Sequence, residues 1–206
     1  MITRIYEENP NPREVRQVAS ALRDGKVAII PTDTLYAFVC GIEHRQAVDV
    51  IARMKGYNIK QAKYALMCAS LSQASEYLRP LDKPTFALLR QCLPGPFTFI
   101  LEANGNVPRT YQNANRTIGI RVPSNEVARA IIEDVGTPLV CTSVRPLGDS
   151  GDEPEQYTDP ELIHERFGRQ VHVVVDGGLA TDEVSTVIDC TADFVITRQG
   201  KGIVEI

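Results

Sequence analysis

Amphipathic stretches with helical spacing alternate with short apolar runs along most of the 206 residues. Residues 11–14 (NPRE) predict a helix start, with an N-cap asparagine, a proline at the first helical position and a glutamate three positions after the cap. Apolar residues at helical spacing follow as far as Leu22, and Gly25 ends this helix. Similar signals predict helices at 44–55, at 125–135, from about 158 to 167, and two between 71 and 93.

The apolar runs between these helices predict strands at 26–31, 64–68, 96–103, 117–123, 138–144, 171–178, 184–190 and 194–200. Helices and strands are interleaved, but the last strands follow one another without helices. We therefore expect an α+β fold, α/β-like, in which helices flank a twisted sheet of parallel and antiparallel strands. No internal repeat or linker interrupts the pattern, which predicts a single domain over residues 1–206 with its core at about 11–201.

The composition is that of an ordinary globular protein, with 43% hydrophobic and 23% charged residues and a formal net charge of −4. The apolar runs are too short to span a bilayer, and the N-terminus lacks the pattern of a signal peptide. We therefore expect a cytoplasmic protein with no membrane partner. Five scattered cysteines without a CxxC pair indicate reduced thiols. Mild acidity argues against a broad nucleic-acid-binding face but is compatible with one basic cleft.

Positive charge is concentrated in residues 52–67 (ARMKGYNIKQAKYALM). There is no Asp or Glu from Val50 to Ser75, while Lys55, Lys60 and Lys63 fall close together. A solvated basic loop would not need the tyrosines and the leucine that stand among these lysines. The stretch is therefore interpreted either as a binding site for a polyanion or as a charged turn between two elements of the hydrophobic core.

Several common catalytic signals do not occur in the sequence. There is no GxxxxGK[ST] phosphate loop, no GxGxxG and no GxSxG. The three histidines lack metal-ligand spacing, so no metal site is predicted. Hydroxyl and cationic side chains instead gather where predicted strands end, which is where open α/β sheets bind ligands. Such donors suit a phosphate chain, although each single hydroxyl is equally compatible with a role in a turn.

Seven blocks of sequence occur along the chain in the same order as in a known protein family. They are IIPTDTLYAFVCG, ARMKGYNIKQAKYALM, LPGPFTFIL, TIGIRVPSN, PLVCTSV, VSTVIDC and ITRQGKG. Through these blocks the chain resembles the YrdC-like domain family, the threonylcarbamoyl-AMP synthase superfamily, over essentially its full length. Within that family it is most similar to the YciO branch. The resemblance implies a YrdC-like fold with a basic concave cleft.

The best-understood members of this family join L-threonine, bicarbonate and ATP into threonylcarbamoyl-adenylate and pyrophosphate, and the adenylate feeds a modification of tRNA adenosine. The resemblance therefore implies ATP or AMP, L-threonine and bicarbonate as small-molecule partners. It implies Mg²⁺ that accompanies ATP and no tightly bound cofactor. Because no covalent enzyme intermediate is needed, positioning and electrostatics would perform the catalysis.

The resemblance also implies roles for individual residues. Lys55 and Arg121 are the candidate catalytic residues, and the PTDTLY segment supplies the candidate contacts to threonine and the carbamate: Thr32, Thr34 and Tyr36. Candidate contacts to the nucleotide and its phosphates are Lys55, Lys60, Lys63, Ser143, Arg145, Ser185, Thr186 and Arg198. No residue is assigned to a metal.

Two positions depart from the synthase motifs. Tyr57 stands where the Lys-x-Arg motif has arginine, and Arg145 stands where the Ser-x-Asn motif has asparagine. A tyrosine offers one neutral hydroxyl in place of a bidentate guanidinium. Ala37 and Phe38 also replace a more usual Tyr-Gly, which would narrow the floor of the pocket.

Two functions therefore remain as hypotheses. The first is a divergent threonylcarbamoyl-AMP synthase of low activity, in which Arg145, Lys60 or Lys63 returns the charge lost at position 57. The second is a non-catalytic module that binds nucleotide, double-stranded RNA or tRNA in the same cleft. Either is compatible with a monomer or a homodimer.

Overall fold

The computed structural model describes residues 1–56, 64–113, 115–145 and 155–205. In these residues ten strands form one mixed sheet in the order β1-β8-β2-β3-β7-β4-β6-β5-β9-β10. The strands are β1 (Ile2–Arg4), β2 (Ala28–Ile30), β3 (Ala37–Gly41), β4 (Ala65–Met67), β5 (Phe97–Glu102), β6 (Thr117–Arg121), β7 (Leu139–Ser143), β8 (Val173–Asp176), β9 (Thr186–Asp189) and β10 (Val195–Arg198). Parallel pairs such as β4–β6 and β5–β9 stand beside antiparallel pairs such as β5–β6, which confirms the predicted mixed sheet.

Seven helices occur in the described ranges: α1 (Pro12–Arg23), α2 (Arg45–Met54), α3 (Leu71–Ser75), α4 (Lys83–Cys92), α5 (Glu126–Val135), α6 (Glu155–Thr158) and α7 (Pro160–Phe167). Their ends follow the predicted capping signals. The Asn11 side chain accepts a hydrogen bond from the Arg13 amide at 3.0 Å at the start of α1, and Gly136 ends α5 with a left-handed φ of 85°. None of these helices is long and apolar enough to cross a membrane.

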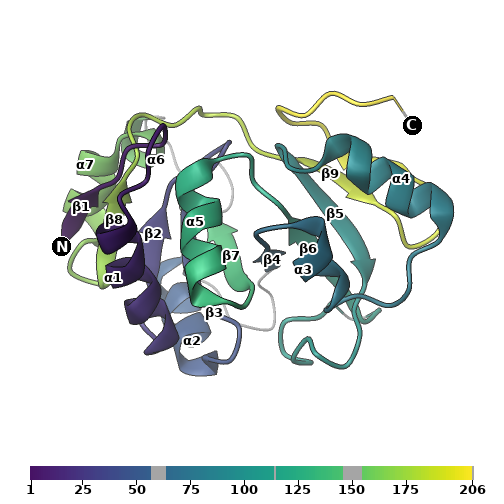
Figure 1. The fold of residues 1–206 in the computed structure, drawn as a ribbon, viewed down its shortest axis with the longest axis horizontal. Helices are drawn as coiled ribbons and strands as arrows, with labels where there is room; N and C mark the ends of the chain where they lie inside the picture. Colours follow the sequence, from purple (N-terminus) through teal and green to yellow (C-terminus); the bar gives the residue numbers. More distant parts are fainter. Residues whose placement is uncertain (57–63, 114, 146–154, 206) are drawn as a thin grey trace.

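Two hydrophobic clusters lie on opposite faces of the sheet because side chains alternate along each strand. In β3, for example, Phe38 and Cys40 belong to the larger cluster, whereas Ala37 and Val39 belong to the smaller one. Residues of α2, α3, α4 and α7 pack into the larger cluster, and residues of α1 and α5 pack into the smaller one. Figure 1 shows α1 and α5 side by side over one part of the twisted sheet, with β5, β6 and β9 beyond them.

Three elements were not predicted from the sequence. Strand β3 has five fully buried residues and therefore shows no alternation of polar and apolar positions. Strand β1 is a three-residue edge strand. Helix α6 lies in a stretch that was predicted as loop because of its poor core composition.

Candidate functional site

A cavity of about 210 Å³, here called the central cavity, opens where several strands carry small side chains on the same face. Ala65 pairs directly with Gly119, and Ala37 pairs with Ser143. A methyl group added at Gly119 would lie only 3.1 Å from Ala65 Cβ. The cavity thus exists because small residues meet at its floor. The lining residues are Thr34, Leu35, Ala37, Tyr64, Ala65, Thr98, Ile100, Asn113, Gly119, Arg121, Cys141, Thr142, Ser143, Val184, Ser185, Val187 and Arg198.

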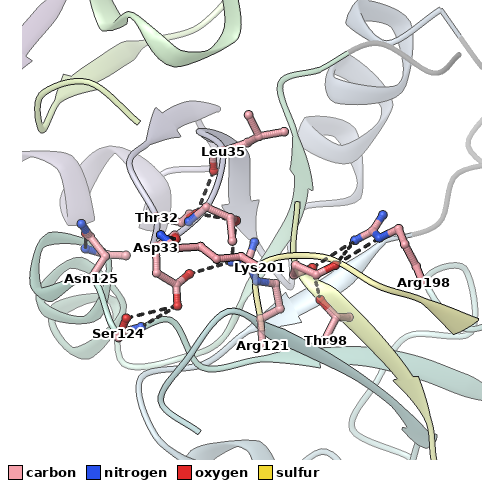
Figure 2. Close-up of polar contacts among 12 residues, drawn as sticks. Thr32, Asp33, Leu35, Thr98, Arg121, Ser124, Asn125, Arg198 and Lys201 are labelled. Carbon is pink, nitrogen blue, oxygen red and sulfur yellow. Dashed lines mark hydrogen bonds and ion pairs between the residues drawn. The ribbon is translucent and has the colours of Figure 1, made fainter. Parts of the chain in front are cut away.

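Arg121, at the end of β6, brings a guanidinium group to this cavity although its residue is only 8% exposed. Its Nη2 donates to Asp33 Oδ1 at 2.8 Å and to Thr34 Oγ1 at 3.0 Å, as Figure 2 shows for the ion pair. Its Nε is buried and has no hydrogen-bond partner among the described residues. Buried donors are normally satisfied, so this nitrogen is free to donate to an acceptor in the cavity, either a ligand or a water molecule.

Asp33 fixes the position of Arg121 and was not assigned a role from the sequence. Its second carboxylate oxygen accepts from the Ser124 amide at 3.0 Å and from the Ser124 hydroxyl at 3.3 Å (Figure 2). Both oxygens are therefore used within the protein, and the Asp33 side chain is only 7% exposed. The carboxylate neutralises part of the Arg121 charge and orients the guanidinium for a further acceptor.

Arg198 brings a second guanidinium from the end of β10. Its Nε and Nη2 donate to the Ser185 carbonyl at 3.1 and 2.8 Å, and the Ser185 hydroxyl lies 2.8 Å from Thr98 Oγ1 (Figure 2). Burial lowers the pKa of Arg198, and the positive charge of Arg121 lowers it further. No carboxylate pairs with Arg198 in the described ranges. Its charge is therefore available to an anion in the cavity.

Residues 199–202, here called the strap, cross from β10 back to the loop that follows β2. The Thr186 hydroxyl, which is fully buried, donates to the Gly202 carbonyl at 2.6 Å and accepts from the Gly200 amide at 3.0 Å. Lys201 Nζ then donates to the Asp33 carbonyl at 2.9 Å. The strap thus joins the strand that carries Arg198 to the residue that holds Arg121.

Lys55, the C-cap of α2, lies at the edge of the site, where its ammonium group binds backbone carbonyls. Nζ donates to the Ser143 carbonyl at 2.7 Å and also to the Arg145 carbonyl. Burial lowers the pKa of Lys55 to about 8. Lys55 therefore connects the end of α2 to the end of β7. Its hydrogen bonds to these carbonyls would have to break before the ammonium group could bind a phosphate.

The lowered pKa of Lys55 predicts a pH dependence of stability. An unfolded lysine has a pKa of about 10.4, so the unfolded chain binds this proton more tightly between about pH 8 and 10.4. The free energy of unfolding of the wild type, relative to Lys55→Met, is therefore expected to rise across this window. Urea denaturation of both proteins at pH 7.5, 8.5 and 9.5 measures this difference in the free energy of unfolding. A difference that does not change with pH would contradict the lowered pKa of Lys55.

The structure brings together some of the residues that the sequence predicted. Thr34, Arg121, Ser143, Ser185 and Arg198 all line the central cavity. Lys55 contacts the backbone of Ser143. These six residues come from six different segments of the chain. Arg121, Ser143 and Arg198 end β6, β7 and β10 of the one sheet, and the others lie in segments next to β3, β9 and α2.

The remaining predicted residues lie elsewhere. The Tyr36 hydroxyl donates to the Gly178 carbonyl at 2.7 Å and accepts from the Gly177 amide at 3.0 Å, away from the cavity lining. Thr32 Oγ1 donates to the Leu35 carbonyl, and Thr186 holds the strap. Each of these three hydroxyls is therefore hydrogen-bonded to backbone groups. Phe38 packs against Phe167 on the other face, whereas Ala37 does line the cavity.

The basic segment cannot be placed in this geometry. Tyr57, Lys60 and Lys63 lie outside the described residues. Arg145 lies in the described ranges and is exposed, and its backbone carbonyl accepts a hydrogen bond from Lys55 Nζ. Asp149 and Asp152, which follow closely in the sequence and could pair with Arg145 outside the cleft, also lie outside the described ranges.

Comparison with known proteins identifies relatives that share this architecture. The family model Sua5_yciO_yrdC, described as "Telomere recombination", matches residues 20–200. The chain is 38% identical to the uncharacterized protein YciO of Escherichia coli (strain K12), over 98% of this chain and 96% of that protein. The crystal structure of E. coli YciO superposes with a TM-score of 0.89, at 35% identity, covering 98% of this chain and 97% of that one.

More distant relatives carry an enzyme name. The chain is 30% identical to the threonylcarbamoyl-AMP synthase of Nitrosococcus oceani, over 82% of this chain and 87% of that protein. The structure of P. abyssi Sua5 complexed with L-threonine superposes with a TM-score of 0.85 at 26% identity, covering 97% of this chain. The match spans only 57% of the Sua5 chain.

Proposed function

Because this chain belongs to the Sua5/YciO/YrdC family, we propose that its central cavity binds ATP or AMP, and that it converts ATP, L-threonine and bicarbonate into threonylcarbamoyl-adenylate and pyrophosphate at a low rate. The observation that carries the proposal is the unpartnered, buried Nε of Arg121 in a cavity that also holds the unpaired charge of Arg198 among the described residues. Two guanidinium groups that face one cavity favour an anionic ligand between them.

The lining of the cavity supports phosphoryl chemistry without a covalent intermediate. Cys141 is the thiol in the lining, and burial raises its pKa to about 11, so it stays protonated at neutral pH. The lining also has serine and threonine hydroxyls, but the described lining residues include no His, Asp or Glu that could act as a general base for them. Arg121 and Arg198 would instead take up charge as a carbamate oxygen attacks the α-phosphate and pyrophosphate departs. The hydroxyls of Thr34 and Ser185 would orient the bound groups.

Mg²⁺ would arrive with the phosphates of ATP in this proposal. Among the described residues no carboxylate lines the central cavity, and the Asp33 oxygens are held by Arg121 and Ser124. No group of three or more His, Cys, Asp or Glu residues in the described ranges is arranged to hold a metal ion. The donor set therefore fits a metal carried by the substrate better than a resident metal.

The proposed rate is low for two reasons, one motif position that differs from the synthases and the hydrogen bonds that hold Lys55. The guanidinium that the synthases have at position 57 is absent, and Lys55 is bound to two carbonyls. Loss of one charged contact to a transferring phosphate costs roughly 10²–10³ in rate.

Pyrophosphate release tests this proposal. Purified protein at high concentration, with Mg-ATP, is expected to release pyrophosphate only when threonine and bicarbonate are both present. Lys55→Ala is expected to lower the rate by about 10²-fold, because it removes a cation next to the phosphates. Lys83→Ala, at an exposed lysine of α4, is the matched control and should leave the rate unchanged.

A non-catalytic binding module is the alternative, and the bonds from Lys55 to backbone carbonyls favour it. In that case the protein would bind ATP, AMP or an RNA such as tRNA without pyrophosphate release. Calorimetric binding of ATP, combined with a threonine-independent background in the pyrophosphate assay, would exclude the synthase and support the module.

A further inference from the structure

Lys201, in the strap, connects two segments that line the central cavity. Its backbone amide donates to the carbonyl of Val184 at 2.9 Å, and Val184 lines the cavity just before β9. Its ammonium group donates to the carbonyl of Asp33 at 2.9 Å, and the next residue, Thr34, lines the cavity between β2 and β3 (Figure 2). Lys201 itself is exposed, so its side chain lies on the solvent side of the cavity.

The backbone of Lys201 is held in place on both sides. The Thr186 hydroxyl binds the strap at Gly200 and at Gly202, the two neighbours of Lys201. A methyl group added at Gly202 would lie 2.5 Å from the Phe97 ring, so the strap packs closely against the core here. The backbone position is therefore fixed, and a change of partner at Lys201 would involve its side chain alone.

The ammonium group of Lys201 has capacity for a further acceptor. Among the described residues it makes one hydrogen bond and no ion pair. An ammonium group has three donors, so two remain. Its one bond is exposed, and water can replace the lysine at the Asp33 carbonyl at little cost. Lys55, by contrast, is half-buried and would lose two carbonyl partners.

The size of the central cavity indicates which part of a nucleotide would reach Lys201. Its volume of about 210 Å³ is smaller than the roughly 300–1,000 Å³ of most small-molecule sites. A nucleoside triphosphate would therefore extend out of the cavity. Arg121 and Arg198 line the cavity and would hold the α-phosphate, whereas phosphates further along the chain would lie on the solvent side, beside Lys201.

We propose that Lys201 binds the β- and γ-phosphates of a nucleoside triphosphate held in the central cavity, and that it thereby favours triphosphates over monophosphates. The proposal rests on the proposed function for the presence of the nucleotide. A lysine suits this position because its compact ammonium group binds phosphate oxygens as a point charge, without a fixed orientation. Lys201 would also supply positive charge where pyrophosphate departs, in a chain that has tyrosine at position 57 in place of the synthase arginine.

Calorimetric titration with ATP and with AMP, in the same buffer with Mg²⁺, tests the proposal. Lys201→Met is expected to weaken ATP binding at least about tenfold but AMP binding by less than about threefold, because AMP has no phosphate beyond the α-phosphate. Lys201→Arg keeps the charge and is expected to hold ATP affinity within about threefold of the wild type. Lys83→Met removes an exposed lysine of α4 and, as the matched control, should change neither affinity.

Equal losses of ATP and AMP affinity in Lys201→Met would overturn the proposal, because the lysine would then act only by holding Asp33 in place. ATP affinity that stays the same in Lys201→Met would exclude the contact with phosphate. Urea denaturation of each variant shows whether a loss of affinity is a loss of folding, and Lys201→Met is expected to unfold at the same urea concentration as the wild type.

The wild type separates failure of this inference from failure of the proposed function. If the wild type binds neither ATP nor AMP, the proposed function is rejected, and the role of Lys201 is rejected with it. If the wild type binds ATP but releases no threonine-dependent pyrophosphate, only the synthase is excluded. The comparison of ATP with AMP in Lys201→Met then still decides whether Lys201 binds the outer phosphates.

Discussion

Replacement of Arg121 by methionine is expected to lower the free energy of unfolding by about 3–5 kcal/mol and to abolish ATP binding. The substitution leaves the Asp33 carboxylate, whose side chain is only 7% exposed, without its cationic partner. Removing one member of a buried ion pair is costly because the remaining charge has lost its hydration and gains nothing in return. Urea denaturation and calorimetric titration with ATP measure the two effects.

A second substitution separates stability from binding. Asp33→Asn added to Arg121→Met removes the unpaired charge, so about half of the lost stability is expected to return while ATP binding stays absent. Arg129→Met is the control, because its ion pair with Glu126 lies at the surface and should contribute less than about 1 kcal/mol. If Arg121→Met kept ATP affinity within about threefold of the wild type, the central cavity would not be the anion site.

Replacement of Gly200 by alanine is expected to cost about 3 kcal/mol in the free energy of unfolding and to lower ATP affinity at least about tenfold. A methyl group at this position would lie 2.2 Å from the Val184 carbonyl oxygen and 2.7 Å from the Ser185 backbone. Backbone cannot yield as a side chain can, so the strap would move away from β9. This movement would release Lys201 from Asp33 and Arg198 from Ser185.

Gly105→Ala provides the matched comparison for this variant. A methyl group at Gly105 has nothing within 4 Å, so the substitution should change stability by less than about 0.5 kcal/mol. Thermal unfolding of both variants, with and without ATP, measures their stability and the stabilisation that ATP adds. Equal stability of Gly200→Ala and Gly105→Ala would show that the strap is not fixed against β9 and has no part in the site.

The fold could be predicted from the sequence where local signals were strong. Helix ends at Asn11 and Gly136, and strand ends such as Arg121, carry residue types with specific backbone roles. Strand β3 was not predicted because all of its residues are buried. The strand therefore lacks the alternation of polar and apolar residues that indicates a strand. Helix α6 escaped because four residues carry too little periodicity to distinguish a helix from a loop.

For the candidate site, the limit of prediction from the sequence has a different cause. The sequence predicted candidate residues at strand ends, but not which hydroxyl lines the central cavity and which one is bonded to the backbone. Thr34 and Ser185 line the cavity, whereas Tyr36 and Thr186 bind backbone groups far from them in sequence. Asp33 was overlooked because its role depends on Arg121, from a strand that is distant in the chain. Such pairings follow from tertiary contacts, which a local pattern does not contain.

The strap also determines when the site can exist during synthesis. Thr34 and Asp33 leave the ribosome early, but Arg198 and Lys201 follow only after nearly all of the sheet has been made. At about 5–20 residues per second, a growing chain spends several seconds as a partial sheet whose cavity lacks one wall. Under the proposed function, nucleotide would therefore stabilise only chains that have been synthesised beyond residue 202, since a ligand adds stability only to the state that binds it.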